Sequence, residues 1–156
     1  RIFGQPVGPK TAADIREIAA STELPFIVKG IMSAEEAVAC ADAGAKGIVV
    51  SNHGGRVLDG MAGTADVLPD IAAAVKGRIT IFVDGGVRHG EDVLKFLALG
   101  ADAALLGRPA AVAAIGGGAE GVKILLDTLK RELSDAMMIT GTATVRSVTA
   151  NILKKL

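Results

Sequence analysis

The sequence contains no tryptophan, no tyrosine and only one cysteine in 156 residues. The single cysteine, Cys40, cannot form a disulfide within the chain. Its alanine-rich surroundings favour a small buried thiol, which is typical of a reducing setting such as the cytoplasm. The first residue is Arg1 rather than methionine. This start and the missing aromatic residues predict that the chain is a fragment or a processed product.

An excess of charge of one sign is also missing, because 17 lysines and arginines balance 17 aspartates and glutamates. No overall field attracts nucleic acid or an anionic membrane surface, so any bound anion must be held locally. No apolar run approaches the roughly 18 to 20 residues that span a bilayer. The N-terminus lacks the layout of a signal peptide. We therefore expect a soluble chain that binds neither nucleic acid nor membrane.

Motifs for metals and dinucleotides are absent as well. One cysteine and two unrelated histidines cannot build a metal site by themselves, which predicts no metal. Neither a P-loop nor a Gly-x-Gly-x-x-Gly fingerprint follows a predicted strand, so an NAD fold is disfavoured. His89 directly follows Arg88 near an expected helix start and has no partner evident from spacing. We interpret it as a surface residue.

What the sequence does contain is a regular alternation of strand and helix patterns. Half of the residues are hydrophobic and 20 are glycines, as in one ordinary globular domain. Short apolar, β-branched runs predict four buried parallel strands at residues 26–29, 47–50, 79–83 and 103–106. Helical patterns between them begin near Ser33, Thr64 and Gly90. Gly44 and Gly100 follow two helices, where a left-handed cap is needed.

Four βα units at roughly 25-residue spacing suit two fold classes. One is a small open α/β sheet, and the other is half of a TIM (β/α)8 barrel, which needs about 250 residues when complete. The C-terminal part predicts two amphipathic helices, at residues 119–133 and 145–156, joined by an irregular segment at 135–144. No linker marks a second domain, so we treat residues 1–156 as one unit.

Unusual polar residues fall where the predicted strands end, which is the functional end of a barrel. One strand is followed by Asp84-Gly85-Gly86-Val87-Arg88 and the next by Gly107-Arg108-Pro109. Glycine amides, two guanidiniums and a helix that begins at about Pro109 would suit a phosphate. The alternative is a pair of tight turns with solvated arginines, which two such loops together make less probable.

A third loop, Ser51-Asn52-His53-Gly54-Gly55-Arg56, carries the catalytic candidates. Neutral His53 can accept a proton, and Arg56 can hold a carboxylate in a bidentate fork. A 2-hydroxy acid offers groups for both, although a lone loop histidine is often only structural. Lys29 ends an apolar run, where its charge needs an anionic partner or an electron-rich ring unless it reaches solvent.

These motifs, with Leu24-Pro25-Phe26-Ile27-Val28-Lys29-Gly30 and Leu58-Asp59, resemble the FMN-dependent 2-hydroxy-acid oxidases and dehydrogenases. That family includes glycolate oxidase, lactate oxidase, mandelate dehydrogenase and the flavocytochrome lactate dehydrogenases. The similarity runs from about Pro9 to Thr149. It implies the C-terminal half of a TIM barrel, with four βα units and additional C-terminal helices.

The resemblance implies a cofactor, FMN, and a role for each candidate residue. Lys29 would contact the flavin N1/O2 region, Ser51 would lie near the flavin and Asp84 would hold the ribityl chain. His53 would take the proton of the substrate 2-hydroxyl, and Arg56 would bind the carboxylate of a lactate- or glycolate-type substrate. The residues implied to bind the FMN phosphate are Gly85, Gly86, Arg88, Gly107 and Arg108.

The chain departs from the family because the first four βα units are missing. These units normally supply two active-site tyrosines, a second carboxylate-binding arginine and the aspartate that orients the histidine. We therefore expect weak or no turnover in isolation, and association either with another copy or with an N-terminal half-barrel. Two alternatives stay open: a non-catalytic, self-associating half-barrel that binds FMN or another phosphate, and a different phosphate-binding barrel.

Overall fold

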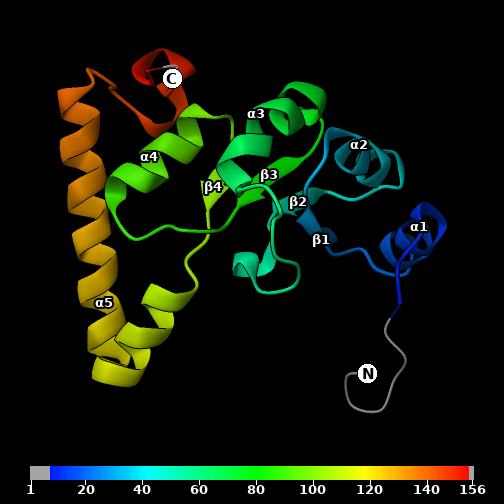
Figure 1. Ribbon diagram of the computed structural model, residues 1–156, viewed down its shortest axis with the longest axis horizontal. Helices are drawn as coiled ribbons and strands as arrows, with labels where there is room; N and C mark the ends of the chain where they lie inside the picture. The colour runs from blue at the N-terminus through cyan, green and yellow to red at the C-terminus, as the bar shows by residue number, and fades with distance from the viewer. Residues whose placement is uncertain (1–7, 155–156) are drawn as a thin grey trace.

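A computed structural model describes residues 8–154 and places them around one four-stranded sheet (Figure 1). Strands and helices alternate along the chain from the first strand to the last long helix. The elements are α1 (Ala12–Ala20), β1 (Ile27–Ile31), α2 (Ala34–Asp42), β2 (Gly47–Val50), η1 (His53–Gly55), α3 (Thr64–Val75), β3 (Thr80–Val83), α4 (Gly90–Ala98), β4 (Ala103–Ala104), α5 (Arg108–Ile139), η2 (Val145–Ser147) and η3 (Ala150–Ile152).

The sheet is parallel throughout and its strands lie in sequence order, β1-β2-β3-β4. In one row across the sheet, Lys29 pairs with Val49, Val49 with Phe82 and Phe82 with Ala103. All four predicted strands are confirmed, although β1 extends to Ile31 and β4 is shorter than expected. Because every strand runs the same way, the loops that follow the strands gather at one edge, called the carboxyl edge below.

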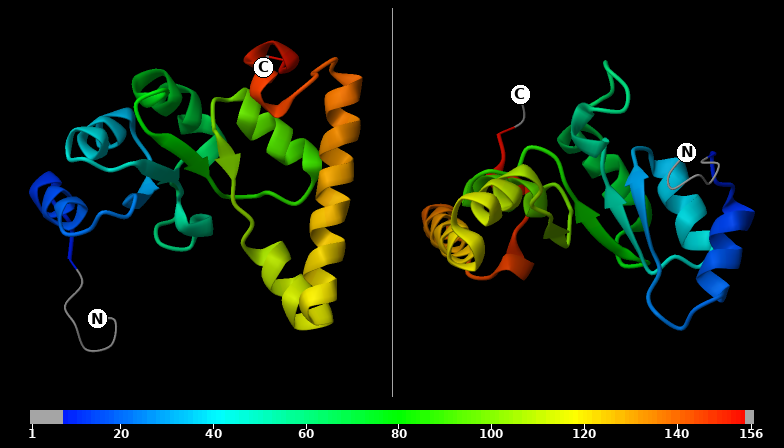
Figure 2. Two further views of the ribbon diagram at one scale, coloured as in Figure 1. Left: turned by 180° about the vertical axis from the view of Figure 1, so that it is seen from behind. Right: turned by 90° about the horizontal axis from the view of Figure 1, so that it is seen from below.

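Helices cover one face of this sheet and leave the other open (Figure 2). Ile48, Val50, Ile81 and Val83 are fully buried in the core that the helices form with the sheet. The alternate residues point the other way: a Cβ on Gly47 would lie 3.5 Å from Ile27 Cγ1 and 3.4 Å from Phe82 Cε2. A doubly wound sheet carries helices on both faces, whereas a barrel carries them only outside. The layering is therefore that of a half barrel.

The predicted helix boundaries are largely confirmed. The hydroxyl of Ser33 accepts a hydrogen bond from the Glu36 amide at 3.2 Å and begins α2. Gly44 and Gly100 have φ of 97° and 113°, the left-handed conformation that their positions predicted. Sequence reasoning did not identify α1, although Thr11 and Asp14 form a capping box at its start.

Two predictions for the C-terminal part are wrong. Residues 135–139 are not irregular, because α5 continues to Ile139, with one kink at Gly118, where φ is 57°. No α-helix forms over residues 145–154, which contain only the short 3₁₀ helices η2 and η3, and residues 155–156 lie outside the described part. The helix continues past residue 135 because residues 122–140 contain no glycine or proline. Beyond Gly141, frequent threonine and valine favour extended backbone over helix.

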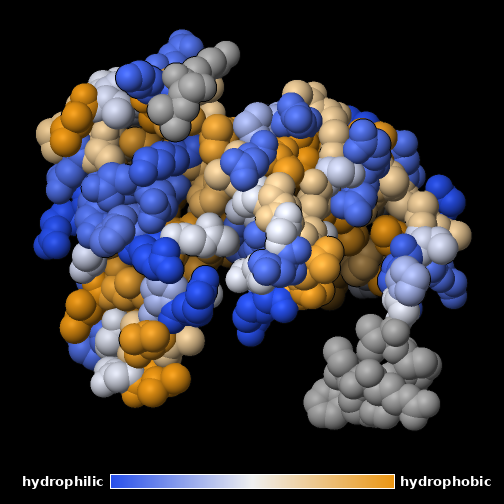
Figure 3. Space-filling view, in the orientation of Figure 1, coloured by the Kyte–Doolittle hydropathy of each residue, from blue (hydrophilic) through white to orange (hydrophobic). Residues whose placement is uncertain are grey.

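Within the described residues, α5 alone is long and apolar enough to cross a membrane by length and composition. Its sequence shows no unbroken apolar run, which is why the sequence analysis did not single it out. The kink at Gly118 interrupts its axis. Ile115 lies near that kink and is 88% exposed, and apolar surface is visible at this end of the helix (Figure 3). One such helix is weak evidence for a span.

Candidate functional site

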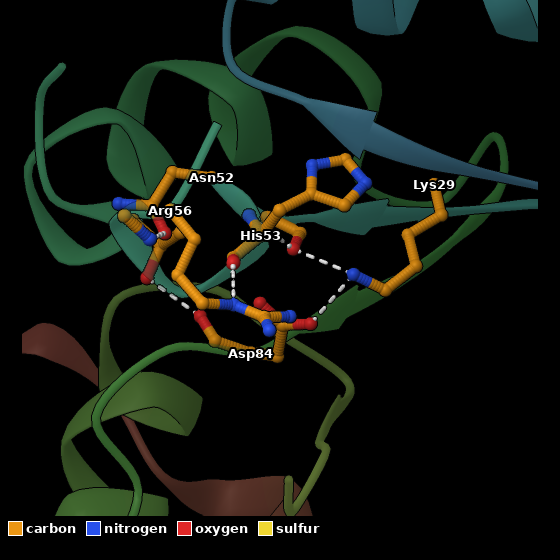
Figure 4. A network of polar contacts seen from close by, with 8 residues as sticks. Lys29, Asn52, His53, Arg56 and Asp84 are labelled. Atoms are coloured by element: carbon orange, nitrogen blue, oxygen red, sulfur yellow. Dashed lines mark hydrogen bonds and ion pairs between the residues drawn. The ribbon is translucent and has the colours of Figure 1, made fainter. Parts of the chain in front are cut away.

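The carboxyl edge holds a contact between three side chains, one in β1 and two directly after β2 and β3 (Figure 4). The Lys29 ammonium donates to Ser51 Oγ at 2.7 Å and pairs with Asp84 Oδ2 at 2.8 Å. Ser51 is 1% exposed, whereas the Lys29 side chain is 44% exposed. The anionic partner that Lys29 was predicted to need is therefore Asp84, which lies 55 positions later in the sequence.

The Asp84 carboxylate is only half satisfied. Its Oδ2 atom contacts Lys29, but Oδ1 is buried and has no hydrogen-bond partner among the described residues. Its backbone carbonyl accepts a hydrogen bond from Thr64 Oγ1 at 2.7 Å, which fixes the end of β3 against the start of α3. A buried acceptor without a donor is costly, and it marks a position where a bound hydroxyl group would be stabilised.

His53 occupies a strained backbone conformation directly after β2. Its φ of 55° is the one positive value for a non-glycine residue in the described part of the chain. The turn is held by Asn52, whose side-chain oxygen accepts from the Gly55 amide at 3.1 Å, and by Ser51 Oγ, which accepts from the His53 amide at 3.1 Å. Such strain persists only where the surroundings enforce it, and it clusters at functional sites.

The imidazole of His53 lies against β1, where the chain has a glycine. A Cβ on Gly30 would stand 2.8 Å from His53 Cε1, so a larger residue would displace the ring. Arg56 is connected to the same turn, because its Nε donates to the His53 carbonyl at 3.3 Å. Both side chains are exposed. The structure thus brings together the predicted proton acceptor, the predicted carboxylate-binding cation and Lys29 at one edge of the sheet (Figure 4).

The two predicted phosphate-binding loops also lie at this edge. Gly85 and Gly86 have φ of 103° and 80°, and a Cβ on Gly86 would meet nothing within 4 Å. Arg88 is exposed, and its amide is held by Asp92 Oδ2 at 2.9 Å. Burial raises the pKa of Asp92, but hydrogen bonds from the Arg88 and His89 amides and the charge of Lys95 outweigh it and lower the pKa.

The second loop ends at the start of α5. Gly107 is the N-cap residue and provides no side-chain hydrogen bond, and a proline occupies the first turn, as predicted. Arg108, the first helical residue, is exposed. Amides at such a helix start and two nearby guanidiniums favour an anion. With the unpaired Asp84 oxygen, the arrangement fits a ligand that carries both a phosphate and hydroxyl groups.

His89 has a partner that spacing could not reveal. Its Nδ1 lies 3.5 Å from Glu132 Oε1, 43 positions later on α5, so the expectation of an unpartnered surface residue was half right. Glu132 Oε2 also accepts from the Gly90 amide at 2.8 Å, and this backbone hydrogen bond, followed by contacts with His89, lowers the pKa of Glu132 against the effect of burial.

Glu91 lies close to this pair, and the potential ligand atoms of the three residues are within 4.8 Å of one another. The positive end of the α4 dipole points at the same place and opposes a cation. The absence of a bound metal stays a prediction.

Sequence reasoning missed two residues that shape the site. Asn52 stood within a recognised motif but received no role, and its amide nitrogen also donates to the Ala62 carbonyl at 3.2 Å. Thr64 was noted only as a helix start, whereas its hydroxyl anchors Asp84. An asparagine followed by glycines is a signal for a side-chain-capped turn, so the role of Asn52 could have been inferred.

Comparisons with known proteins identify one family and several similar proteins. Residues 3–155 match the model of a family described as FMN-dependent dehydrogenase. The chain is 48% identical to an L-lactate oxidase of Lactobacillus jensenii, covering 92% of this chain and 35% of that protein. It is 46% identical to a peroxisomal (S)-2-hydroxyacid oxidase of Arabidopsis thaliana, covering 88% and 38%.

Solved structures resemble the fold closely. A crystal structure named as a lactate oxidase of Pediococcus acidilactici superposes with a TM-score of 0.92 at 44% identity, covering 99% of this chain and 44% of that one. A mandelate oxidase bound to a substituted phenylpropionic acid gives 0.87 at 46% identity, covering 91% and 43%. The chain therefore spans well under half the length of the relatives it matches.

Proposed function

This chain belongs to the FMN-dependent dehydrogenase family, and we propose that it supplies the FMN-phosphate site and the catalytic histidine for oxidation of a small (S)-2-hydroxy acid to a 2-oxo acid. The observation that carries this proposal is the half-satisfied Asp84 carboxylate beside two glycine-arginine loops. In a ligand with a phosphate and an attached polyhydroxyl chain, a hydroxyl group would donate to the buried Asp84 Oδ1, and the phosphate would bind the two loops. Relatives named as lactate, mandelate and 2-hydroxyacid oxidases support the substrate class.

The proposed roles follow from position and charge. Asp84, Gly85, Gly86 and Arg88, with Gly107 and Arg108, would hold FMN, and Lys29 and Ser51 would stand at its ring system. Bound FMN would supply the acceptor for the two electrons that the substrate loses. The exposed His53 imidazole would remove the proton of the substrate hydroxyl, and Arg56 would fix the substrate carboxylate.

The strained turn at His53 would contribute by orienting the imidazole before substrate arrives. Ser51 Oγ connects the two functions, because it accepts from both the Lys29 ammonium and the His53 amide. The cofactor ring and the proton acceptor would thus be positioned by one buried hydroxyl. Preorganisation of this kind lowers the entropic cost of reaching the reactive geometry.

The chain alone does not contain a complete site. It spans 35–38% of the curated relatives described above, and it has no tyrosine. Completion requires a surface that covers the open face of the sheet, either an N-terminal half-barrel or another copy. The alternative function, favoured by these omissions, is a non-catalytic half-barrel that binds FMN or another phosphate. The buried Cys40, whose thiol pKa is raised by burial, is compatible with our proposal of a cytoplasmic setting.

The test is an FMN titration followed by visible absorbance, with anaerobic L-lactate added at saturation. We expect saturable FMN binding and weak or no bleaching by lactate. Riboflavin, which lacks the phosphate, should bind at least about tenfold more weakly, since one charge-assisted hydrogen bond contributes about 1.5–3 kcal/mol. Bleaching would show that lactate reduces the flavin on this chain, whereas the lack of saturable FMN binding would refute the proposal. Binding without bleaching is expected both of a site that lacks its N-terminal half and of the non-catalytic alternative.

Matched variants sharpen this test. Arg88→Gln and Arg108→Gln should each raise the Kd for FMN about tenfold or more for the same reason. Arg16→Gln provides the control, because Arg16 is exposed on α1, which precedes the sheet. Equal FMN affinity in the wild type and both site variants would refute the phosphate assignment. Tighter binding of sugar phosphates than of FMN would favour a different phosphate-binding barrel.

A further inference from the structure

Thr64 is one of two polar residues that are buried in the described part of the chain. It is 4% exposed, and the other, Ser51, is 1% exposed and accepts two hydrogen bonds within the candidate site. Thr64 is the first residue of α3, but the helix start does not use its hydroxyl, because Asp66 Oδ2 accepts from the amide of the N-cap residue Gly63 at 2.9 Å. A buried hydroxyl needs a partner, and that of Thr64 has its partner outside α3.

This partner lies at the end of β3. Thr64 Oγ1 donates to the Asp84 carbonyl at 2.7 Å, and the Asp84 amide donates to the Val50 carbonyl at 3.1 Å. The backbone of Asp84 is therefore held from two sides, independently of the ion pair between its side chain and Lys29. Thr64 also lies against the next residue, since a Cβ on Gly85 would stand 2.9 Å from Thr64 Oγ1. Thr64 thus fixes the peptide that joins residues 84 and 85.

The orientation of this peptide determines where the Gly85 amide points. The peptide is trans, so its carbonyl and its N–H point in opposite directions. Because the carbonyl points at Thr64, the Gly85 N–H points away from it. Among the described residues, neither the Gly85 amide nor the Gly86 amide has a hydrogen-bond acceptor. Since a Cβ on Gly86 would meet nothing within 4 Å, there is space beside these amides, and successive free amides of this kind bind anions.

We propose that Thr64 is a positioning residue for the phosphate site, because its hydroxyl holds the peptide between residues 84 and 85 in the orientation that presents the Gly85 amide to the phosphate of FMN. The inference rests on the proposed function and deepens it. Thr64 itself would touch neither cofactor nor substrate. An anchor is needed because Gly85 and Gly86, with φ of 103° and 80°, could adopt many other conformations at little cost.

FMN titrations of Thr64→Val and Thr64→Ser, followed by visible absorbance, test the proposal. Valine keeps the shape of threonine but cannot donate, so the Kd for FMN should rise about tenfold, the usual effect of one lost hydrogen bond. Serine keeps the hydroxyl and should restore the affinity. Thr140→Val is the matched control, because it removes a hydroxyl that donates to the Ala136 carbonyl at 2.9 Å on α5, and it should leave the Kd unchanged. Circular dichroism establishes that each variant is folded.

Riboflavin separates a role at the phosphate from general damage to the site. Thr64→Val should weaken FMN binding but not riboflavin binding, so the preference for FMN should shrink by about tenfold. Equal losses for both ligands would overturn the proposal, as would wild-type FMN affinity in Thr64→Val or a failure of Thr64→Ser to restore binding. The lack of saturable FMN binding by the wild type would instead refute the proposed function, and the inference with it.

A second measurement needs no variant and covers the case in which Thr64→Val does not fold. In heteronuclear NMR spectra of the wild type, the Gly85 amide resonance should shift when FMN reaches saturation. The amide of Gly77, which lies between Lys76 and Arg78 at the opposite edge of the sheet, should not shift. A Gly85 resonance that stays unchanged at saturation would show that this amide does not face the phosphate, and would overturn the proposal.

Discussion

Replacement of Gly90 by alanine tests how closely α4 and α5 approach. A Cβ on Gly90 would lie 2.6 Å from the Glu132 carbonyl carbon and 2.6 Å from the Leu129 oxygen, with Leu133 N as its nearest neighbour. All three are backbone atoms of α5, so no side-chain rotation can relieve the clash. The methyl group would also disturb the hydrogen bond from the Gly90 amide to Glu132.

We expect Gly90→Ala to lower the free energy of unfolding by about 3 kcal/mol, the upper end of the usual cost of overpacking, because a whole helix must move. Urea unfolding followed by circular dichroism at a fixed protein concentration measures it. With an m value of about 2 kcal/mol/M, the midpoint should fall by about 1.5 M.

The control variant is expected to change the free energy of unfolding in the opposite direction. Gly116 lies within α5, and a Cβ there would meet nothing within 4 Å. Gly116→Ala should therefore stabilise the protein by about 0.5–1 kcal/mol, because alanine loses less backbone entropy in a helix than glycine. A Gly90→Ala midpoint within error of wild type would refute the close packing of α4 on α5.

Three further predictions concern charged groups and strain. Lys29→Met should cost about 1–3 kcal/mol in urea unfolding by leaving Asp84 unpaired, and the double variant with Asp84→Asn should recover part of that loss. The pKa of Glu132 is lowered in the folded state, so its stabilisation is present above the ordinary glutamate pKa and is lost as pH falls through the folded value. Thermal unfolding across that range should show this loss in wild type and its absence in Glu132→Gln; equal pH profiles would disprove the linkage. His53→Asn should unfold at an equal or higher urea concentration, since asparagine tolerates a positive φ, and a clearly lower midpoint would contradict backbone strain.

Local sequence signals were sufficient for most of the fold. The strand of residues 47–50 was predicted with its observed bounds because four β-branched or small apolar residues stand between Lys46 and a polar loop. The start of α2 after Ser33 follows from capping chemistry that needs only neighbouring residues. The start of α3 was predicted one residue too late, because Gly63 is its N-cap and the Thr64 hydroxyl bonds to Asp84 instead. The strand and helix pattern alone left a half barrel and an open sheet as alternatives, because that distinction depends on tertiary layering. The motif resemblance implied the half barrel, and the face without helices confirms it.

The positions of the candidate site residues could be predicted from the sequence, but the contacts between these residues could not. Strand ends gave Lys29 and Asp84 as separate candidates, whereas their ion pair joins residues 55 positions apart and has no local signal. The same applies to His89 and Glu132. The extent of α5 was missed for a different reason: a change from helix to loop was assigned near Asp135, where no residue terminates the helix. The helix ends only near Gly141, which has a φ of 67°.

Departures from ordinary local rules concentrate at the carboxyl edge. The strained His53 backbone and the unpaired Asp84 oxygen both lie there. At the opposite edge, Arg78 pairs with Asp42, while Lys76 donates to the Gly100 carbonyl at 2.8 Å and pairs with Asp102 at 3.5 Å. The ion pairs at the opposite edge are thus complete, whereas the strained backbone and the unpaired acceptor remain at the carboxyl edge. Since strain and unpaired acceptors cost stability, their confinement to one edge argues that a ligand completes it.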